Sequence, residues 1–133
     1  MPIEPGLVNE IKIKVTDDMT AEASDVAGMA PVLATHRMIS YLERTAHMAV
    51  FPLLAEGQST VGTLVNVRHL AATPVGMEVR LRAELVEVDR RRLLFKVEAW
   101  DEVEKIGEGQ HERFIIDVQR FLGGVEKKRL LKG

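Results

Sequence analysis

The chain changes its hydrophobic period once, and that change limits the folds it can adopt. From about Thr35 to Leu54, apolar residues recur at steps of three and four, the spacing of one helix face. After Gly57, apolar and polar residues alternate almost to Val118, the spacing of strands that bury one face. The sequence therefore predicts one long helix followed by a sheet. Thr35 is the expected N-cap of the helix, and Pro52 with Gly57 marks its end.

The alternation divides into several strands. One short strand is expected before the helix at 11–15, and four follow it at 61–69, 77–88, about 92–100 and 105–118. The apolar phase slips at Val86 and Val88, which predicts a bulge, while 16–31 reads as a loop or lid-like segment. This order describes a single α+β domain over residues 1–133: a hotdog fold, with a curved antiparallel sheet of about five strands around one helix. The uncovered sheet edges favour a homodimer.

Composition and charge exclude several functional classes. With 18 Lys and Arg against 20 Asp and Glu, no whole-molecule field favours nucleic acid or an anionic membrane. No cysteine is present, which rules out a disulfide framework and a thiolate nucleophile. The amino-terminal residues lack the basic start and apolar run of a signal peptide, so we expect a cytoplasmic protein with no nucleic-acid and no membrane partner. The basic tail at 126–133 is expected to be a solvated, frayed terminus.

Few residues could carry chemistry, because the common hydrolase, nucleotide and metalloprotease motifs are absent from the sequence. Glu43 projects to the rim of the apolar helix face, where partial burial disfavours the charged form and suits a general base. Periodicity alone favours a different interpretation, in which Glu43 extends to solvent or pairs with Arg44 or His47. Glu43 and His47 have the i,i+4 spacing of a metal pair, but no third ligand accompanies them.

Two further groups lie on strands. His69 falls at a strand end on the same predicted face as Val61 and Val65, where a histidine is more often a packed residue than an acid-base group. His111 and Arg113 share a face that also carries Gly107 and Gly109, which leaves room for an anionic ligand. For Arg113, an ordinary ion pair with Glu112 or Asp117 is at least as well supported.

Three sequence blocks together resemble the fluoroacetyl-CoA thioesterases and their hotdog relatives. They are the segment 69–76 (HLAATPVG), the segment 107–113 (GEGQHER) and the helix opening Ala34-Thr35 with Glu43. The resemblance covers roughly residues 34–121. It implies that Thr35, Glu43 and His69 are catalytic, and that Gly62 and Arg113 line the substrate pocket.

The resemblance further implies a homodimeric acyl-CoA thioesterase with a short acyl substrate, no metal and no organic cofactor. The alternative is a hotdog module that binds acyl-CoA or a similar small molecule without turning it over. One segment departs from the family pattern. The fluoroacetyl-specific enzyme has a Phe-rich lid before its catalytic Thr, whereas residues 20–33 here contain no aromatic residue. We therefore expect thioester hydrolysis without fluoroacetyl selectivity.

Overall fold

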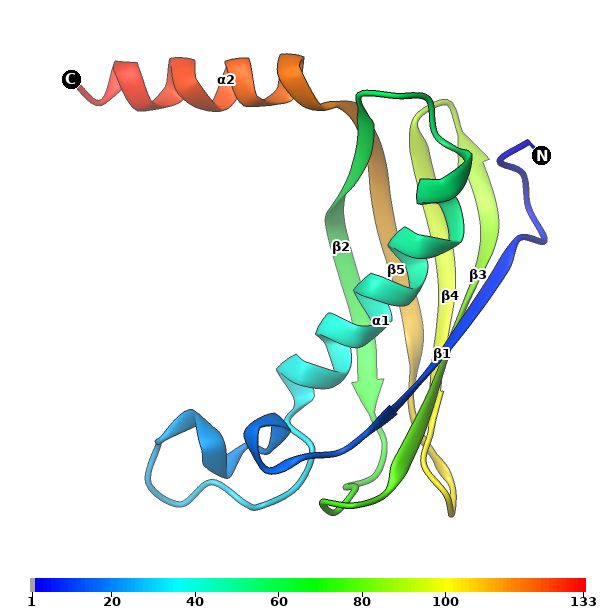
Figure 1. Ribbon diagram of the computed structural model, residues 1–133, viewed down its shortest axis with the longest axis vertical. Helices are drawn as coiled ribbons and strands as arrows, with labels where there is room; N and C mark the ends of the chain where they lie inside the picture. The colour runs from blue at the N-terminus through cyan, green and yellow to red at the C-terminus, as the bar shows by residue number, and fades with distance from the viewer. Residues whose placement is uncertain (1) are drawn as a thin grey trace.

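A curved antiparallel sheet wraps one face of a single long helix (Figure 1). The computed structural model describes residues 2–133. The helix is α1 (Thr35–Val50), and the five strands lie in the order β1 (Val8–Lys14), β3 (Glu78–Asp89), β4 (Arg92–Trp100), β5 (Lys105–Asp117) and β2 (Gln58–His69). The predicted α+β class and the strand number are thereby confirmed. β1 and β2 form the two edges.

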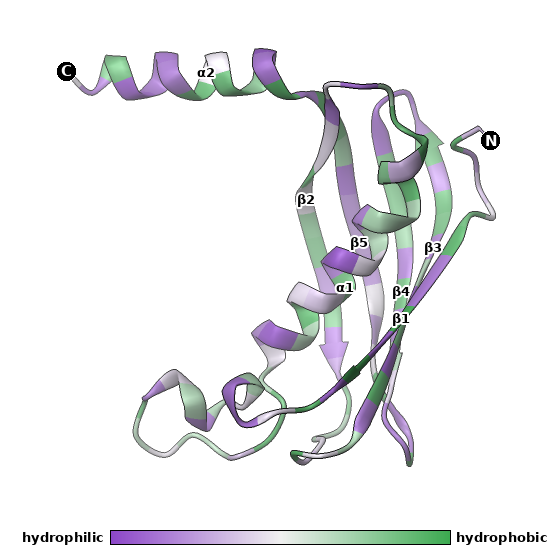
Figure 2. Cartoon of the chain, in the orientation of Figure 1, coloured by the Kyte–Doolittle hydropathy of each residue, from purple (hydrophilic) through white to green (hydrophobic). Residues whose placement is uncertain are grey.

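The core fills the space between α1 and the concave face of the sheet. Met38, Leu42 and Ala46 recur on one face of α1 and are fully buried. Every second residue of β3 and β4 faces them, and these side chains have no exposed area: Val79, Leu81, Ala83, Leu85, Leu93, Phe95, Val97 and Ala99. Burial of each large apolar side chain contributes about 1.5–3 kcal/mol, so this face holds the helix in place. Figure 2 shows the resulting alternation of apolar and polar residues along the strands.

The start and end of α1 differ in detail from the prediction. Ala34, in an extended conformation, occupies the N-cap position, and Thr35 is the first helical residue. The prediction that Thr35 caps the helix is wrong, because its hydroxyl bonds to a different element. At the other end α1 passes into a short 3-10 turn, η3 (Phe51–Leu53), that contains Pro52.

The segment before α1 has little regular structure, as predicted. It contains two single 3-10 turns, η1 (Asp17–Met19) and η2 (Glu22–Ser24). Backbone hydrogen bonds attach its end to the turn after β2, from Leu33 N–H to the Thr73 carbonyl. The segment therefore lies beside the beginning of α1.

Two bulges change which residues face the helix. The predicted bulge in β3 is confirmed between Leu85 and Glu87. A second bulge, in β2, was not predicted: Gly62 pairs with Arg113 and Leu64 with Glu112, so Thr63 has no partner of its own. One extra residue reverses the alternation, which brings Gly62 onto the same face as His69. The predicted face shared by Val61, Val65 and His69 is therefore wrong at Val61.

A second helix, α2 (Val118–Leu131), replaces the expected frayed tail. It leaves the end of β5, projects away from the body past the β2 edge, and buries none of its residues (Figure 1). Its apolar side chains Phe121, Leu122 and Val125 are 41%, 55% and 46% exposed. In the described residues 2–133, neither helix is long and apolar enough to cross a membrane.

Candidate active site

The five residues named by the sequence resemblance all lie along the seam between α1 and the strands β2 and β5, in two polar clusters. The first contains Thr35 and His69, and the second contains Glu43, Gly62 and Arg113. α1 and β2 run in opposite directions along this seam, because the first residue of α1 meets the last residue of β2. The clusters therefore lie at different heights of the seam.

The first cluster is a hydroxyl bonded to an imidazole. Thr35 Oγ1 lies 2.8 Å from His69 Nδ1. Burial lowers the pKa of His69, so the ring is neutral at pH 7 and one nitrogen can accept a proton. His69 Nε2 is buried and, within residues 2–133, no hydrogen-bond partner satisfies it. An imidazole in this state can take or give a proton when a ligand arrives.

A pocket of about 390 Å³ opens at the first cluster. Thr35 is exposed in it, and the walls are small or apolar: Ala21, Val32, Leu33, Ala34, Leu70, Ala71 and Ala72. These walls come from the segment before α1 and from the turn after β2. The pocket can therefore hold a small apolar group against the Thr35 hydroxyl.

The second cluster is organised by Arg113, whose side chain is 10% exposed. Its Nε donates to Thr60 Oγ1 at 2.7 Å, and one terminal nitrogen donates to the Thr60 carbonyl at 3.1 Å. The other terminal nitrogen lies 3.4 Å from Glu43 Oε2 and 3.1 Å from His111 Nε2. Burial lowers the pKa of Arg113, and the nearby Glu43 carboxylate opposes that shift. The buried cation is thus compensated by a carboxylate and three neutral acceptors.

Arg113 does not pair with the acidic residues that lie near it in the sequence; it pairs with Glu43. Of those nearby acids, Glu112 pairs with Arg92 and Asp117 pairs with Arg91. Glu43 is 39% exposed on its side chain, as expected at the rim of the apolar face. It is therefore held by a buried cation while it remains accessible from outside.

Gly62 leaves the Glu43 carboxylate uncovered. A Cβ at this position would lie 2.9 Å from Glu43 Oε2 and 3.2 Å from an Arg113 terminal nitrogen. Both distances are too short for a relaxed side chain, so a glycine keeps the approach to the carboxylate open.

Three further residues belong to the second cluster: Thr60, which the sequence analysis missed, and His111 and His47, which it considered only for an anionic ligand and a metal pair. Thr60 accepts from Arg113, His111 accepts from it through Nε2, and His47 contacts the Thr60 hydroxyl. The i,i+4 spacing of Glu43 and His47 was a usable signal, since it puts both on one helix face. Thr60 gave no such signal, because the β2 bulge that turns it inward is not visible in the pattern.

The two clusters do not meet within one chain. Thr35 and Glu43 are separated by eight residues of α1, which corresponds to about 12 Å along the helix axis. Thr35 and His69 are brought into contact, but no hydrogen bond joins either of them to Glu43 in the described part of the chain.

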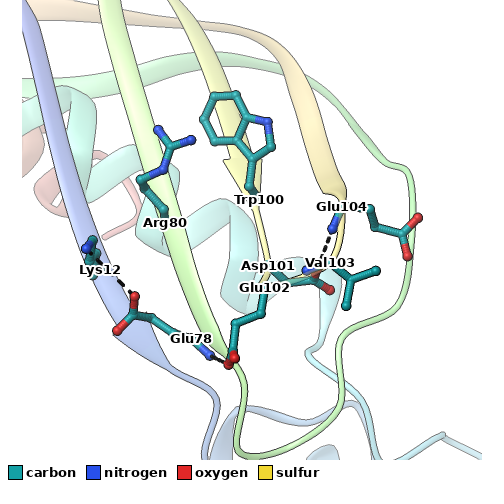
Figure 3. A pocket seen from close by; sticks show the side chains of 8 residues that line it. All are labelled: Lys12, Glu78, Arg80, Trp100, Asp101, Glu102, Val103 and Glu104. Atoms are coloured by element: carbon teal, nitrogen blue, oxygen red, sulfur yellow. Dashed lines mark hydrogen bonds and ion pairs between the residues drawn. The ribbon is translucent and has the colours of Figure 1, made fainter.

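Another hollow lies on the opposite, convex side of the sheet (Figure 3). Arg80 stacks over Trp100 at 4.1 Å, and Lys12 is 3.9 Å from Glu78. Asp101 accepts hydrogen bonds from the backbone N–H groups of Val103 and Glu104, and Glu102 accepts one from that of Glu78. These polar groups stabilise each other and the turn between β4 and β5. We assign this hollow a structural role.

No three metal-binding side chains come together anywhere in residues 2–133. Glu43 and His47, the pair with metal-like spacing in the sequence, bind Arg113 and Thr60 instead.

Comparison with known proteins identifies the family of the chain. The family described as fluoroacetyl-CoA-specific thioesterase matches residues 15–119. The fluoroacetyl-CoA thioesterase of Streptantibioticus cattleyicolor is 37% identical over 115 residues, which are 86% of this chain and 83% of the relative. A solved structure of the fluoroacetyl-CoA thioesterase FlK superposes with a TM-score of 0.90 at 34% identity, covering 96% of this chain and 98% of that one. A thioesterase superfamily member from Thermus thermophilus reaches 0.89 at 30% identity, covering 99% and 98%.

The fold and these matches define the chain as a hotdog-fold thioester hydrolase. It belongs to the fluoroacetyl-CoA-specific thioesterase family. The fold and family expected from the sequence are thus confirmed.

Proposed function

We propose that this protein hydrolyses short-chain acyl-CoA thioesters to the free acid and CoA. The observation that carries the proposal is the Thr35 hydroxyl, bonded to a neutral His69 at the open mouth of a small apolar pocket. A thioester carbonyl in that pocket would meet a hydrogen-bond donor and a proton acceptor together. The Glu43 carboxylate, exposed beside Gly62, supplies the third group.

Each of the five residues then has a role in the reaction. In one route Glu43 takes a proton from the water that attacks the carbonyl carbon, and the carbon–sulfur bond of the resulting intermediate breaks. In the other route Glu43 itself attacks the carbon, CoA leaves as the thiolate, and water then hydrolyses the acyl–Glu43 anhydride, which frees the acid and restores the carboxylate. Thr35 polarises or orients the carbonyl, and the neutral His69 takes up a proton released by the attacking water and gives it to the departing CoA sulfur. Arg113 holds Glu43 in place, and Gly62 leaves space for the acyl group.

We expect the acyl group of the substrate to be short, and we expect unfluorinated acyl groups to be accepted. Ala34, Ala71 and Ala72 form a small pocket beside Thr35, and the segment 20–33 offers aliphatic rather than aromatic side chains over it. An aliphatic cover can shield an acyl chain but cannot present a rigid aromatic wall.

Hydrolysis of acetyl-, fluoroacetyl- and butyryl-CoA by one preparation tests this expectation about the acyl group. We expect similar rates for acetyl and fluoroacetyl. Binding without turnover would favour the non-catalytic module, and a fluoroacetyl preference of several orders of magnitude would overturn the argument from the aliphatic cover.

We further propose that the working unit is a homodimer that pairs along β2. Residues 62–66 of this edge strand are all exposed, including Leu64 and Val65 at 45% and 44%. An antiparallel two-fold pairing centred near Val65 would bring Gly62 and Glu43 of one chain opposite His69 and Thr35 of the other. The 12 Å gap between the clusters would then be closed across the interface, because each site would use both chains.

The helix α2 supports the same assembly. It projects past the β2 edge (Figure 1). Its residues Phe121, Leu122 and Val125 are exposed. A second chain seated on β2 would lie beside α2 and would give these apolar side chains a surface to pack against. Light scattering should give twice the chain mass of 14.9 kDa.

Mixing two inactive variants tests whether the site is shared. Thr35→Ala and Glu43→Gln homodimers each lose activity in this scheme. After random reassociation of an equal mixture, half of the dimers are mixed and each has one intact site, so about a quarter of the wild-type activity should return. A mixture that stays inactive while mass analysis shows mixed dimers would place all three residues of a working site in one chain.

A further inference from the structure

The Glu43–Arg113 pair continues inward through two more side chains, and neither has a role in the reaction proposed above. Arg113 Nε donates to Thr60 Oγ1 at 2.7 Å, and Thr60 Oγ1 lies 2.6 Å from His47 Nδ1. His47 stands one helical turn after Glu43 on α1, and its ring packs on Phe51 with centroids 5.0 Å apart. The contacts form a closed path that leaves α1 at Glu43 and returns to it at His47.

The protons along this path can be assigned from the chemistry of the groups. A guanidinium has only donors, so Thr60 Oγ1 must accept from Arg113. The Thr60 hydroxyl is buried, with the residue 6% exposed, and its own proton needs an acceptor. His47 Nδ1 is the acceptor within reach. His47 is therefore neutral, with its proton on Nε2.

A protonated His47 would break this arrangement. Both Nδ1 and Arg113 Nε would then donate to Thr60, and the Thr60 proton would have no acceptor. The surroundings of His47 also favour its neutral form, because burial and the positive charge of Arg113 both lower its pKa. The negative charge of Glu43, one turn earlier on α1, is already paired with Arg113, and His111 beside Arg113 is neutral.

His111 repeats the pattern on the other side of Arg113. Its Nδ1 donates to the Leu64 carbonyl at 2.8 Å, which leaves Nε2 to accept from Arg113 at 3.1 Å. Burial lowers the pKa of His111. Two neutral imidazoles thus fix the guanidinium, one directly and the other through Thr60.

We infer that His47 is a positioning residue for hydrolysis: by accepting the Thr60 proton, it fixes the hydroxyl oxygen that holds Arg113, and Arg113 holds Glu43. The inference rests on the proposed role of Glu43 in the thioesterase reaction. His47 does not touch the substrate in this scheme. Its contribution should appear in the chemical step, where the direction of the Glu43 carboxylate matters, and hardly in substrate binding.

Paired substitutions at His47 test the role. His47→Leu removes the acceptor and should lower kcat about tenfold, the value of one well-placed hydrogen bond, with KM changed less than about twofold. His47→Asn keeps an acceptor at the position of Nδ1 and should recover most of the loss. The control is Met48→Asn, at the next residue, which is 44% exposed. Equal losses in His47→Leu and His47→Asn, or no loss in either, would overturn the inference.

A double substitution tests the path through Thr60. Thr60→Val keeps the shape of the side chain and removes the hydroxyl, so it should lower kcat as His47→Leu does. If His47 acts through Thr60, adding His47→Leu to Thr60→Val should cost almost nothing further. Losses that multiply would show that His47 acts by another route.

The imidazole nitrogen shifts of His47 give a readout that does not depend on activity. Nuclear magnetic resonance at pH 7 should show Nε2 protonated and Nδ1 as a hydrogen-bonded acceptor, and Thr60→Val should remove the Nδ1 hydrogen bond. A proton on Nδ1 would overturn the inference whether or not the protein hydrolyses thioesters. If the wild-type protein is inactive toward every acyl-CoA while these shifts agree, the proposed function fails and the hydrogen-bond path stands.

Discussion

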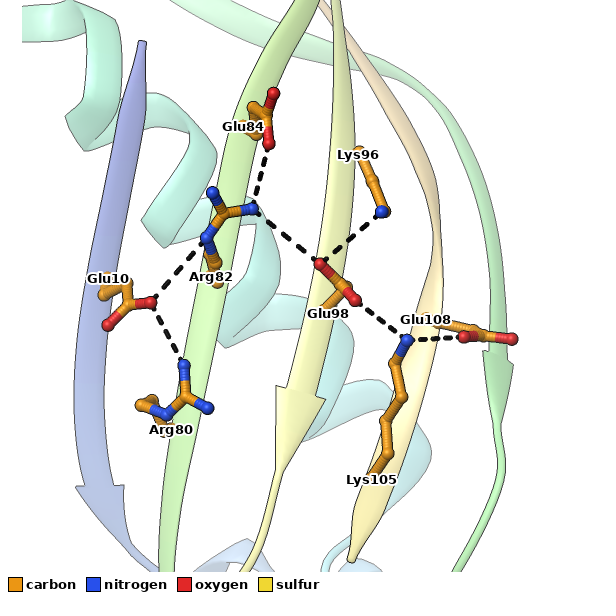
Figure 4. A network of polar contacts seen from close by, with 8 residues as sticks. All are labelled: Glu10, Arg80, Arg82, Glu84, Lys96, Glu98, Lys105 and Glu108. Carbon is orange, nitrogen blue, oxygen red and sulfur yellow. Dashed lines mark hydrogen bonds and ion pairs between the residues drawn. The ribbon is translucent and has the colours of Figure 1, made fainter. Parts of the chain in front are cut away.

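The two faces of the sheet use the same charged residue types in opposite ways. On the convex face, eight side chains of β1, β3, β4 and β5 form a network in which Arg82 contacts Glu10, Glu84 and Glu98 (Figure 4). On the concave face, the single guanidinium of Arg113 is buried and each of its N–H-bearing nitrogens has a defined acceptor. A charge in the convex network can exchange partners and meet water, whereas Arg113 cannot. In this fold an ion pair therefore fixes the position of its side chains where the guanidinium is buried, as at Arg113.

The largest contrast is expected between Arg113 and Arg82. Arg113→Met should lower the free energy of unfolding by about 3–5 kcal/mol, because it leaves Glu43, Thr60 and His111 without their partner. Arg82→Met, on a side chain 27% exposed, should cost less than about 1 kcal/mol. Urea unfolding of both variants measures the two values. Similar losses would remove the distinction between the two faces.

Glu43 and Glu98 separate the two faces by activity. Glu43→Gln should keep the fold, since size and polarity hardly change, and lower kcat by about 10²-fold or more because the ionised oxygen is lost. Glu98→Gln, in the convex network, should leave kcat unchanged. Steady-state kinetics together with melting temperatures distinguish lost chemistry from unfolding. A folded Glu43→Gln protein with near-normal turnover would contradict the assignment.

Gly62 tests how closely the concave network controls Glu43. Gly62→Ala would place a methyl group 2.9 Å from Glu43 Oε2, so the carboxylate must move by a few tenths of an ångström. We expect kcat to fall about tenfold, a change of about 1.4 kcal/mol, with an unchanged circular dichroism spectrum. A crystal structure should show the carboxylate displaced. Full activity with an undisplaced carboxylate would mean that the position of Glu43 is not critical.

The smallest effect is the response of stability to pH. Burial lowers the pKa of His47, His69 and His111 in the folded chain below the ordinary value of 6.5. At a pH between the folded-state and the unfolded-state pKa of a histidine, the unfolded chain binds more protons than the folded chain. The free energy of unfolding therefore has its full value above pH 6.5 and falls as the pH drops toward the folded-state pKa values. Urea unfolding between pH 7.5 and 5.5 should show this loss, smaller than that of Arg113→Met. Greater stability at pH 5.5 would contradict the burial of neutral imidazoles.

Much of the fold follows from the period of apolar residues, which located α1, five strands and the bulge near Val86. That bulge was visible because a strand with a buried face shows every change of phase. The bulge at Thr63 was not, because β2 is an edge strand whose middle is exposed, and its apolar residues Val61 and Leu64 face away from the core or into solvent. The pattern of apolar residues therefore does not reveal the register of this edge strand.

The five candidate site residues, Thr35, Glu43, His69, Gly62 and Arg113, came from short motifs whose spacing resembles a known family. Their contacts with one another could not be predicted in full. The partner of Arg113 could not be predicted, because Glu43 is seventy positions away and Glu112 is adjacent. The helix α2 was missed for another reason. None of its apolar residues is buried against the described residues 2–133, and the glycines at 123 and 124 lower helix propensity.

The unpaired Thr63 has a consequence for engineering and for sequence alignment. Removal of this one residue would leave every other side chain of the site in place in the sequence, yet it would turn Thr60 and Gly62 to the opposite face of β2. An alignment gap misplaced by a single position here would likewise match inward residues with outward ones. Strand length in this region is therefore as much a determinant of the site as any of its functional groups, and design should vary the loops around β2 while keeping its residue count.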